Sequence, residues 1–246
     1  MRLYIPDIII TFLLGITLFS CDNENALECF KKTGEMTEEE FFLDPFTEIV
    51  VMDEADVYLD NGPHQKIYIK AGENLISDIN FNVTDSVLTI TNKNRCNWVR
   101  TPGNPGIYIT NNLLDKIEIY DYSNFYTVDT LSLKKLEIYS DGTGNFDITL
   151  NLDTLYIESI YISNFKIAGY INSLNILFTN DSRFDGKQLL SNFNEIKHHG
   201  SNLIELYPLK SLTGELNSTG SIHYYFDPEF IDVRIEGSGK LIGIVE

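Results

Sequence analysis

The sequence predicts an all-β fold, a single-stranded parallel β-helix (β-solenoid) with about 19 residues per coil, because a fixed short period is typical of one supersecondary unit stacked on copies of itself. Three residue series indicate this period. Apolar residues recur at Leu114, Leu133, Leu152, Ile171, Leu190, Leu209 and Pro228. A second apolar series holds Ile117, Leu136, Leu155, Leu174, Phe193, Leu212 and Ile231. Small residues form the third series, Gly144, Ser163, Ser182, Ser201, Gly220 and Gly239.

Each repeat has the pattern of two strands joined by a tight turn. Residues 116–120, 135–139 and 154–158 alternate between apolar and polar, as a strand with one face in a core does. A second strand is predicted at 145–148 and again at 164–167. The small-residue series falls between the two strands, where Gly tolerates positive φ and Ser side chains bond to turn backbone.

Residues 1–20 are predicted to be a lipoprotein signal peptide. The apolar run from Ile8 to Phe19 is shorter than the ~20 residues that span a bilayer, and Leu18-Phe19-Ser20-Cys21 follows it. This resembles a bacterial lipoprotein box, so Cys21 is the predicted lipid attachment site. Its acyl chains would hold the protein on a membrane without a transmembrane helix. An ordinary signal peptide with an incidental cysteine is the alternative.

Residues 21–45 are predicted to be an acidic tether, with Glu38-Glu39-Glu40 as its most acidic run. If Cys21 is lipidated, Cys29 and Cys96 remain, and an even pair in an exported protein is most simply a disulfide. Two buried free thiols are the alternative.

Residues 46–246 are predicted to form the β-solenoid domain, with irregular coils at 46–110 and regular 19-residue coils at 111–246. In the first part, Val50, Ile69, Leu88 and Ile107 follow the same spacing, but polar insertions interrupt the pattern. A separate N-terminal domain is the alternative. Bulged or loop-bearing coils are expected at residues 124–128 and around Phe193, where the alternation slips.

The charge balance limits the partners. The chain has 36 acidic and 18 basic residues and a net charge of −18, so nucleic acid is excluded as a partner because phosphate binding needs clustered Lys and Arg. No calcium-loop spacing D-x-[DN]-x-[DN]-G occurs, and no cofactor is predicted.

Four segments carry a resemblance to a known family: residues 46–51, 69–76, 87–90 and 236–242, together with Cys29-Phe30-Lys31 and Cys96-Asn97-Trp98-Val99-Arg100. On these residues the chain resembles the head GIN domain family of auto-transporter adhesins, common among lipoproteins of Bacteroidetes. The resemblance implies a β-helix and an adhesin-like binding or scaffold module without catalytic activity. It also implies an outer-membrane location, lipid-anchored at the cell surface or the periplasmic face.

A β-helix enzyme that degrades polysaccharide, a lyase or a glycosidase, is the alternative. Such enzymes need two carboxylates, or a base with Arg or Lys, on adjacent coils. Asp147 and Lys166 are expected to be neighbours on successive coils, an arrangement typical of a surface contact. His198 and His199 are adjacent on a strand, so they point to opposite faces and cannot chelate one metal ion. No catalytic or metal site is predicted.

Tyrosines offer a possible binding face. Tyr120 and Tyr139 lie one period apart, and outward tyrosines along a solenoid could form a platform for a glycan or a protein ligand. The alternative is that tyrosine suits half-exposed strand positions.

Overall fold

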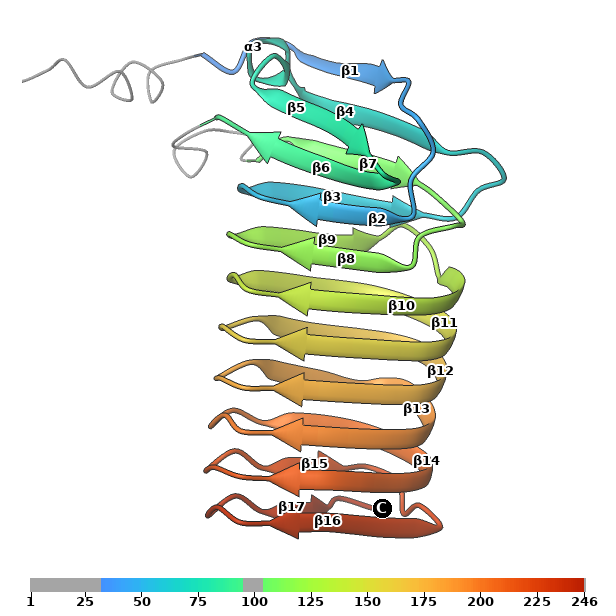
Figure 1. Cartoon of the computed structure of the whole chain (residues 1–246), viewed down its shortest axis with the longest axis vertical. Coiled ribbons are helices and arrows are strands. Elements are labelled where there is room, and N and C mark those ends of the chain that lie inside the picture. Colours follow the sequence, from blue (N-terminus) through green and yellow to red (C-terminus); the bar gives the residue numbers. More distant parts are fainter. Residues whose placement is uncertain (1–31, 95–103, 246) are drawn as a thin grey trace, which may run out of the picture.

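The computed structural model describes residues 32–94 and 104–245, and about 64% of the chain is strand. Figure 1 shows flat coils stacked along one axis, with about 7 turns roughly 19 residues apart. Each coil gives one strand to each of two facing sheets, and strands of successive coils pair in parallel. The single-stranded parallel β-solenoid that the repeat predicts is therefore confirmed.

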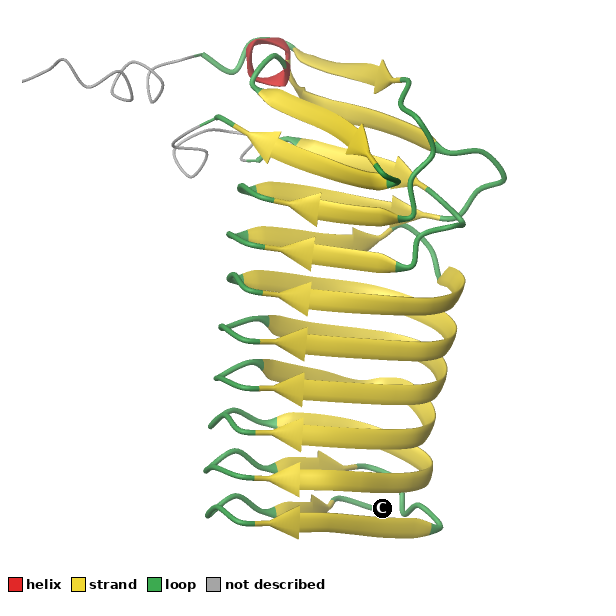
Figure 2. Cartoon of the chain, viewed as in Figure 1, coloured by secondary structure: helices red, strands yellow, loops and turns green. Residues whose placement is uncertain are grey.

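The two sheets are named here by their position in Figure 1. The front sheet holds β6 (Val87–Asn92), β2 (Glu48–Val51), β8 (Lys116–Ile119), β10 (Leu131–Ser140), the second halves of β11 (Gly144–Ser159), β12 (Asn164–Phe178), β13 (Arg183–His198) and β14 (Ile204–Leu216), and β16 (Phe230–Ile235). The back sheet holds β4 (Lys66–Gly72), β7 (Gly106–Thr110), β3 (Ala55–Asp60), β9 (Ser123–Thr127), the first halves of β11–β14, β15 (Ile222–Tyr224) and β17 (Leu241–Gly243). Figure 2 shows tight turns at one edge and near-continuous strand at the other.

Side chains of successive coils stack in ladders inside the solenoid. Phe146 pairs with Phe165 in parallel register, and their ring centroids lie 4.8 Å apart. Phe125 extends this ladder, with its ring centroid 5.1 Å from that of Phe146, and Phe178, at the other end of the same strand β12 as Phe165, packs against Phe165 at 5.4 Å. All four rings are buried. These ladders convert the repeat of the sequence into one continuous apolar core.

The small-residue series closes the tight turns. Three serines at these turns are fully buried: Ser159, Ser163 and Ser182. A larger side chain would not fit in the space that each of them fills. The hydroxyls of Ser159 and Ser182 share a hydrogen bond of 2.7 Å, and the Ser163 amide donates to Ser182 Oγ at 3.0 Å. Serine therefore suits the turn for two reasons: it is small, and its hydroxyl forms hydrogen bonds with buried polar groups.

The slip expected around Phe193 is confirmed, but the predicted core positions of Leu190 and Phe193 are wrong. The register between β12 and β13 shifts after Lys166, so that Leu174 pairs with Asn194. One extra residue reverses every following side chain between core and solvent. Phe193 is consequently 45% exposed and Leu190 41%, whereas Asn194 is only 2% exposed.

The buried Asn194 is accommodated by hydrogen bonds. Its Oδ1 accepts a 2.6 Å bond from Ser191 Oγ, and its Nδ2 donates a 2.9 Å bond to the carbonyl oxygen of Ser211. A buried amide with partners costs far less than an orphaned one.

The coil that starts at β8 is longer than the repeat of the later coils. Ile117 pairs with Ile138 rather than with Leu136, a step two positions longer than the repeat, and Phe125 pairs with Phe146 by the same longer step. From Leu131 onward the regular step holds, so the additional residues lie in the connection after β9. The irregularity expected at 124–128 is real, but it belongs to this connection.

The N-terminal part does not follow the series Val50, Ile69, Leu88 and Ile107 as successive coils. The β2–β3 coil stacks directly on β8–β9, with Ile49 opposite Ile117. On its other side it pairs in parallel with β6 and β7. Beyond these, β4 pairs antiparallel with β7, β5 (Ile79–Thr84) pairs antiparallel with β6, and α3 (Glu73–Ile76) follows β4. These elements cover the end of the core.

The acidic tether predicted for residues 21–45 contains a strand in its last part. Met36–Phe41 forms β1, which pairs antiparallel with the free edge of β4. Acidic and basic side chains face one another across this pair, with Glu38 Oε1 3.1 Å from Lys70 Nζ. Phe41 packs edge-on against Phe81 at 4.9 Å. The acidic run is a strand because β4 supplies both a backbone partner and lysines.

The two adjacent histidines point to opposite faces, as expected. His198 is fully buried at the end of the phenylalanine stack, and its Nε2 donates to the Asn202 carbonyl oxygen at 2.7 Å. His199 is exposed beside Glu215. Burial lowers the pKa of His198 below its usual range; the bond to Asn202 and the charge of Asp181 raise it, and His199 lowers it further.

The lowered pKa predicts a pH-dependent stability. Below the unfolded-state pKa of about 6.5, the unfolded chain binds a proton that folded His198 does not, so the free energy of unfolding falls as the pH drops. We expect urea denaturation to give a smaller free energy at about pH 5 than at about pH 7.5. His198→Phe should remove this part of the slope, whereas His199→Gln should leave it. An unchanged slope in His198→Phe would contradict the assignment.

Candidate functional site

A groove runs over the outer face of the front sheet, and it consists of three adjoining hollows that share Tyr156. The first hollow, of about 290 Å³, is lined mainly by Glu118, Tyr120, Glu137, Tyr139, Tyr156 and Glu158. Each of these side chains alternates with a core residue along its strand, or in the case of Tyr120 directly follows the last residue of β8, which is why they point outward. We refer to the three hollows together as the front groove.

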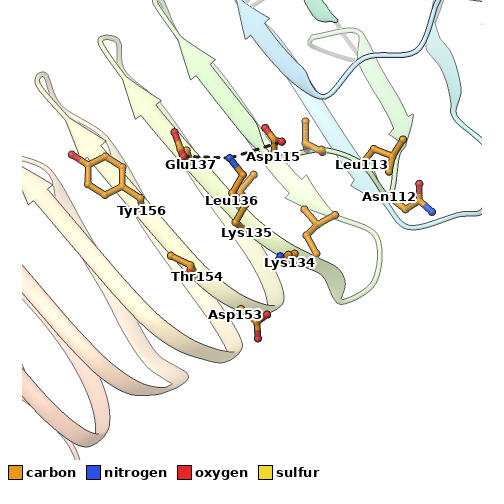
Figure 3. Close-up of a pocket in the computed structure, with 12 residues that line it drawn as sticks. Asn112, Leu113, Asp115, Lys134, Lys135, Leu136, Glu137, Asp153, Thr154 and Tyr156 are labelled. Atoms are coloured by element: carbon orange, nitrogen blue, oxygen red, sulfur yellow. Dashed lines mark ion pairs between the residues drawn. The ribbon is translucent and has the colours of Figure 1, made fainter.

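The second hollow, of about 490 Å³, lies where β10 bends and the connection before β8 passes over it. Its lining includes Leu113, Leu133, Lys135, Glu137, Thr154 and Tyr156. Figure 3 shows Lys135 between two acids, with Nζ 3.9 Å from Asp115 Oδ2 and 3.6 Å from Glu137 Oε1. The third hollow, of about 100 Å³, continues the groove past Tyr156 to Asn175, Glu195 and Lys197. Tyr156 is therefore the centre of the front groove.

The predicted pair Tyr120 and Tyr139 lies together in the first hollow. Their ring centroids are 6.0 Å apart and the ring planes are tilted by 54°, so neither ring covers the face of the other. The Tyr120 hydroxyl donates a 2.7 Å bond to Glu118 Oε2. That bond, together with burial, raises the pKa of Tyr120 to about 12. The pair borders a groove rather than forming a flat platform.

The carboxylate of Glu118 is held in its ionised form. Burial alone raises its pKa, but hydrogen bonds from Lys116 and Tyr120 outweigh burial and hold the pKa below the usual value. Tyr156 makes a similar contact two coils further on, where its hydroxyl donates to Glu158 Oε2 at 3.2 Å. The groove thus presents aromatic rings beside carboxylate oxygens that can accept hydrogen bonds.

A second tyrosine cluster lies on the back sheet, and the 19-residue period does not predict that its members contact one another. Tyr68, Tyr108, Tyr58 and Tyr126 stack in that order, with centroid distances of 4.7, 4.5 and 5.0 Å and interplanar angles of 4° to 22°. Because each ring covers the face of the next, the cluster offers mostly ring edges and hydroxyls to a ligand. We interpret it as a stabilising ladder across β4, β7, β3 and β9.

The remaining polar candidates do not gather into a catalytic or metal site. Asp147 and Lys166 form the expected exposed ion pair at 2.9 Å. In residues 32–94 and 104–245, no cluster of three or more His, Cys, Asp or Glu could hold a metal ion. Among the residues that the structure describes, the carboxyl groups with a clear pKa shift, Glu118, Asp181, Glu205 and Glu215, all have a lowered pKa.

Three predicted residues, Cys21, Cys29 and Cys96, lie outside the described residues, as does the predicted signal peptide at 1–20. The lipid attachment and the disulfide therefore stay predictions. In the described part of the chain, no helix has the length and apolar character to cross a membrane.

The fold and the groove define a repeat protein of the β-solenoid class with a ligand-sized outer groove. The sequence pattern of the family described as "Putative auto-transporter adhesin, head GIN domain" matches residues 45–228. The chain belongs to this family. The resemblance noted from its sequence motifs is thereby confirmed, and the family description is that of an adhesin, a class of protein that binds ligands at cell surfaces.

Solved structures share the fold at low sequence identity. A putative adhesin from Bacteroides fragilis is 21% identical with a TM-score of 0.77, covering 85% of this chain and 97% of its own. A putative adhesin from Parabacteroides distasonis is 16% identical, with a TM-score of 0.64 and coverage of 86% and 98%. A putative lipid binding protein from the same species is 17% identical, with a TM-score of 0.61 and coverage of 86% and 97%. No curated protein matches the chain.

Proposed function

We propose that the protein is a cell-envelope lipoprotein whose solenoid binds an uncharged glycan in the front groove, without catalysis. The observation that carries this proposal is the position of Tyr156, where three hollows meet between aromatic rings and carboxylates. Sugar rings have apolar faces, which pack on aromatic rings, and hydroxyl groups, which donate to ionised carboxylates. The front groove supplies both kinds of surface side by side.

The charges of the groove favour an uncharged ligand over an anionic one. Lys116 contacts Glu118, and Lys135 is shared by Asp115 and Glu137, so these lysines are already neutralised by the protein. The net charge of −18 adds a repulsive field for polyanions. An acidic polysaccharide would meet few free cations here.

The same electrostatics support binding over hydrolysis. A glycosidase needs one carboxylic acid with a raised pKa to protonate the leaving oxygen. Glu118, the groove carboxylate with a clear shift, has a lowered pKa and stays ionised. Glu118 is therefore suited to accepting hydrogen bonds from a ligand.

The envelope location rests on the predicted signal peptide and on the family. The apolar run before Cys21 has the length of the apolar region within a signal peptide, and the family description is that of an adhesin. Lipidation at Cys21, an outer-membrane location and the Cys29–Cys96 disulfide are parts of this proposal.

An array of immobilised uncharged oligosaccharides probed with the full chain tests the groove. For any oligosaccharide bound, we expect Tyr156→Ala to weaken binding about 2- to 12-fold, because one aromatic stacking contact contributes roughly 0.5–1.5 kcal/mol. Tyr120→Ala with Tyr139→Ala should also weaken it. Tyr126→Ala on the back sheet is the matched control and should leave binding unchanged. Equal loss in the control, or no loss in Tyr156→Ala, would place the ligand elsewhere.

A further inference from the structure

The two ends of the solenoid differ in how their strands are paired. At the N-terminal end, β1, β4 and β5 add antiparallel strands beyond the last parallel coil. At the other end, β16 pairs on one side with β14, and β17 pairs on one side with β15. Within the described residues, the outer edges of β16 and β17 have no strand beside them. Such edges are templates for pairing with another strand.

The core is also open at this end. In β14, the inward residues Leu212 and Leu216 are fully buried. Their register partners in β16 are Ile231 and Ile235, and Ile235 is 46% exposed. On the back sheet, the inward residue Ile222 of β15 is fully buried, whereas its register partner Leu241 in β17 is only partly buried. Repeat proteins normally cover such a surface, because a bare end exposes the apolar ladder to water.

The sequence of β16 is complementary to itself when reversed. In an antiparallel pair centred on Val233, Asp232 of each copy lies opposite Arg234 of the other, on the outer face. On the inner face, Ile231 lies opposite Ile235, and Val233 opposite Val233. A twofold axis along the sheet normal produces this arrangement and continues both sheets from one copy into the next.

Neighbouring registers are unfavourable. Centring on Asp232 places the two aspartates opposite each other, and centring on Arg234 places the two arginines opposite each other. A pairing centred between two neighbouring residues would place each inward-facing residue opposite an outward-facing one. Among the registers centred on Asp232, Val233 and Arg234, only the one centred on Val233 satisfies both charge and burial.

We propose that the protein forms a head-to-head dimer in which β16 pairs antiparallel with β16 of a second copy, centred on Val233. The partner strand completes the edge and covers the open apolar end. It also brings Asp232 of each copy to Arg234 of the other, which contacts Glu215 at 2.7 Å and Glu236 at 3.4 Å in its own chain, so the partner carboxylate joins an existing cluster of charges. The dimer does not use the front groove, whose nearest hollow ends on β13, two coils from β16 (Figure 1).

Sedimentation of the full chain in density-matched detergent tests the dimer with a charge exchange. Asp232→Arg alone and Arg234→Asp alone should each weaken self-association at least about 10-fold, because both cross-strand pairs become repulsive. Mixing the two variants restores opposite charges at all four positions, so the mixture should form heterodimers. Asp147→Arg is the control: it makes the same aspartate-to-arginine change at an exposed position of β11 that lies in neither the front groove nor the edge strand.

Each result decides the proposal, provided that circular dichroism shows the variants folded. A wild-type chain that stays monomeric overturns the dimer. So does a dimer that survives Asp232→Arg, because another surface would then form it. Variants that each become monomeric but fail to associate when mixed overturn the register centred on Val233.

Discussion

Replacing Phe165 by alanine is expected to lower the free energy of unfolding by about 3–5 kcal/mol, the usual cost of deleting a buried phenylalanine ring. Phe165 is 1% exposed and lies between Phe146 at 4.8 Å and Phe178 at 5.4 Å. The rigid coils above and below cannot collapse into the space, because each is fixed by the parallel hydrogen bonds of its neighbours. Urea denaturation followed by far-ultraviolet circular dichroism measures the loss.

Phe193 provides the matched control. Its ring is 45% exposed and contacts the Lys210 ammonium at 5.4 Å, so Phe193→Ala should change the free energy of unfolding by at most about 1 kcal/mol. The repeat alone assigns Phe193 to the core. Comparable losses in the two variants would show that the register of β13 is wrong.

Replacing Cys21 by alanine is expected to move the protein out of the membrane fraction almost completely. Among the described residues no helix can cross a membrane, and the proposed acyl chains on Cys21 would supply the membrane affinity. In a bacterial host that processes lipoproteins, detergent phase partitioning should place the wild-type chain in the detergent phase and Cys21→Ala in the aqueous phase. Intact mass should show the lipid on the wild-type chain alone.

Cys29→Ala is the control for this experiment, because it removes a nearby cysteine that is proposed to form a disulfide rather than to carry lipid. It should stay in the detergent phase. Retention of Cys21→Ala in that phase, with an unmodified mass for the wild type, would contradict lipid attachment at this cysteine.

The regular coils are predictable from the sequence because residues one period apart stack on each other in successive coils. Equivalent residues such as Phe146 and Phe165 contact each other directly, so a constant period is itself a statement about contacts. The bulge in β13 interrupts this constant spacing. Its local signal is Gly186, whose position would bring a Cβ within 2.4 Å of the Phe184 ring and 2.9 Å of the Glu205 carbonyl oxygen. A glycine outside the small-residue series was thus a sign of close approach.

The covered N-terminal end could not be predicted, because its pairings are antiparallel or distant in sequence. β2 stacks on β8 although β3 to β7 lie between them in the chain, and no period reports such a step. The groove was predictable only in part. Alternation showed that Tyr120, Tyr139 and Tyr156 point outward, but the second hollow depends on Leu113, which reaches it from the connection before β8.

The different ends give the molecule a direction. The chain enters the described structure at Lys32, beside the covered end, so a lipid on Cys21 would hold that end toward a membrane and the open end away from it. About 7 turns at a spacing of ~4.8 Å make the stack roughly 34 Å long. Two copies joined through β16 would form a rod about twice that length with a membrane attachment at each end. Such a rod is a homotypic bridge, able to link two facing bilayers at a fixed separation.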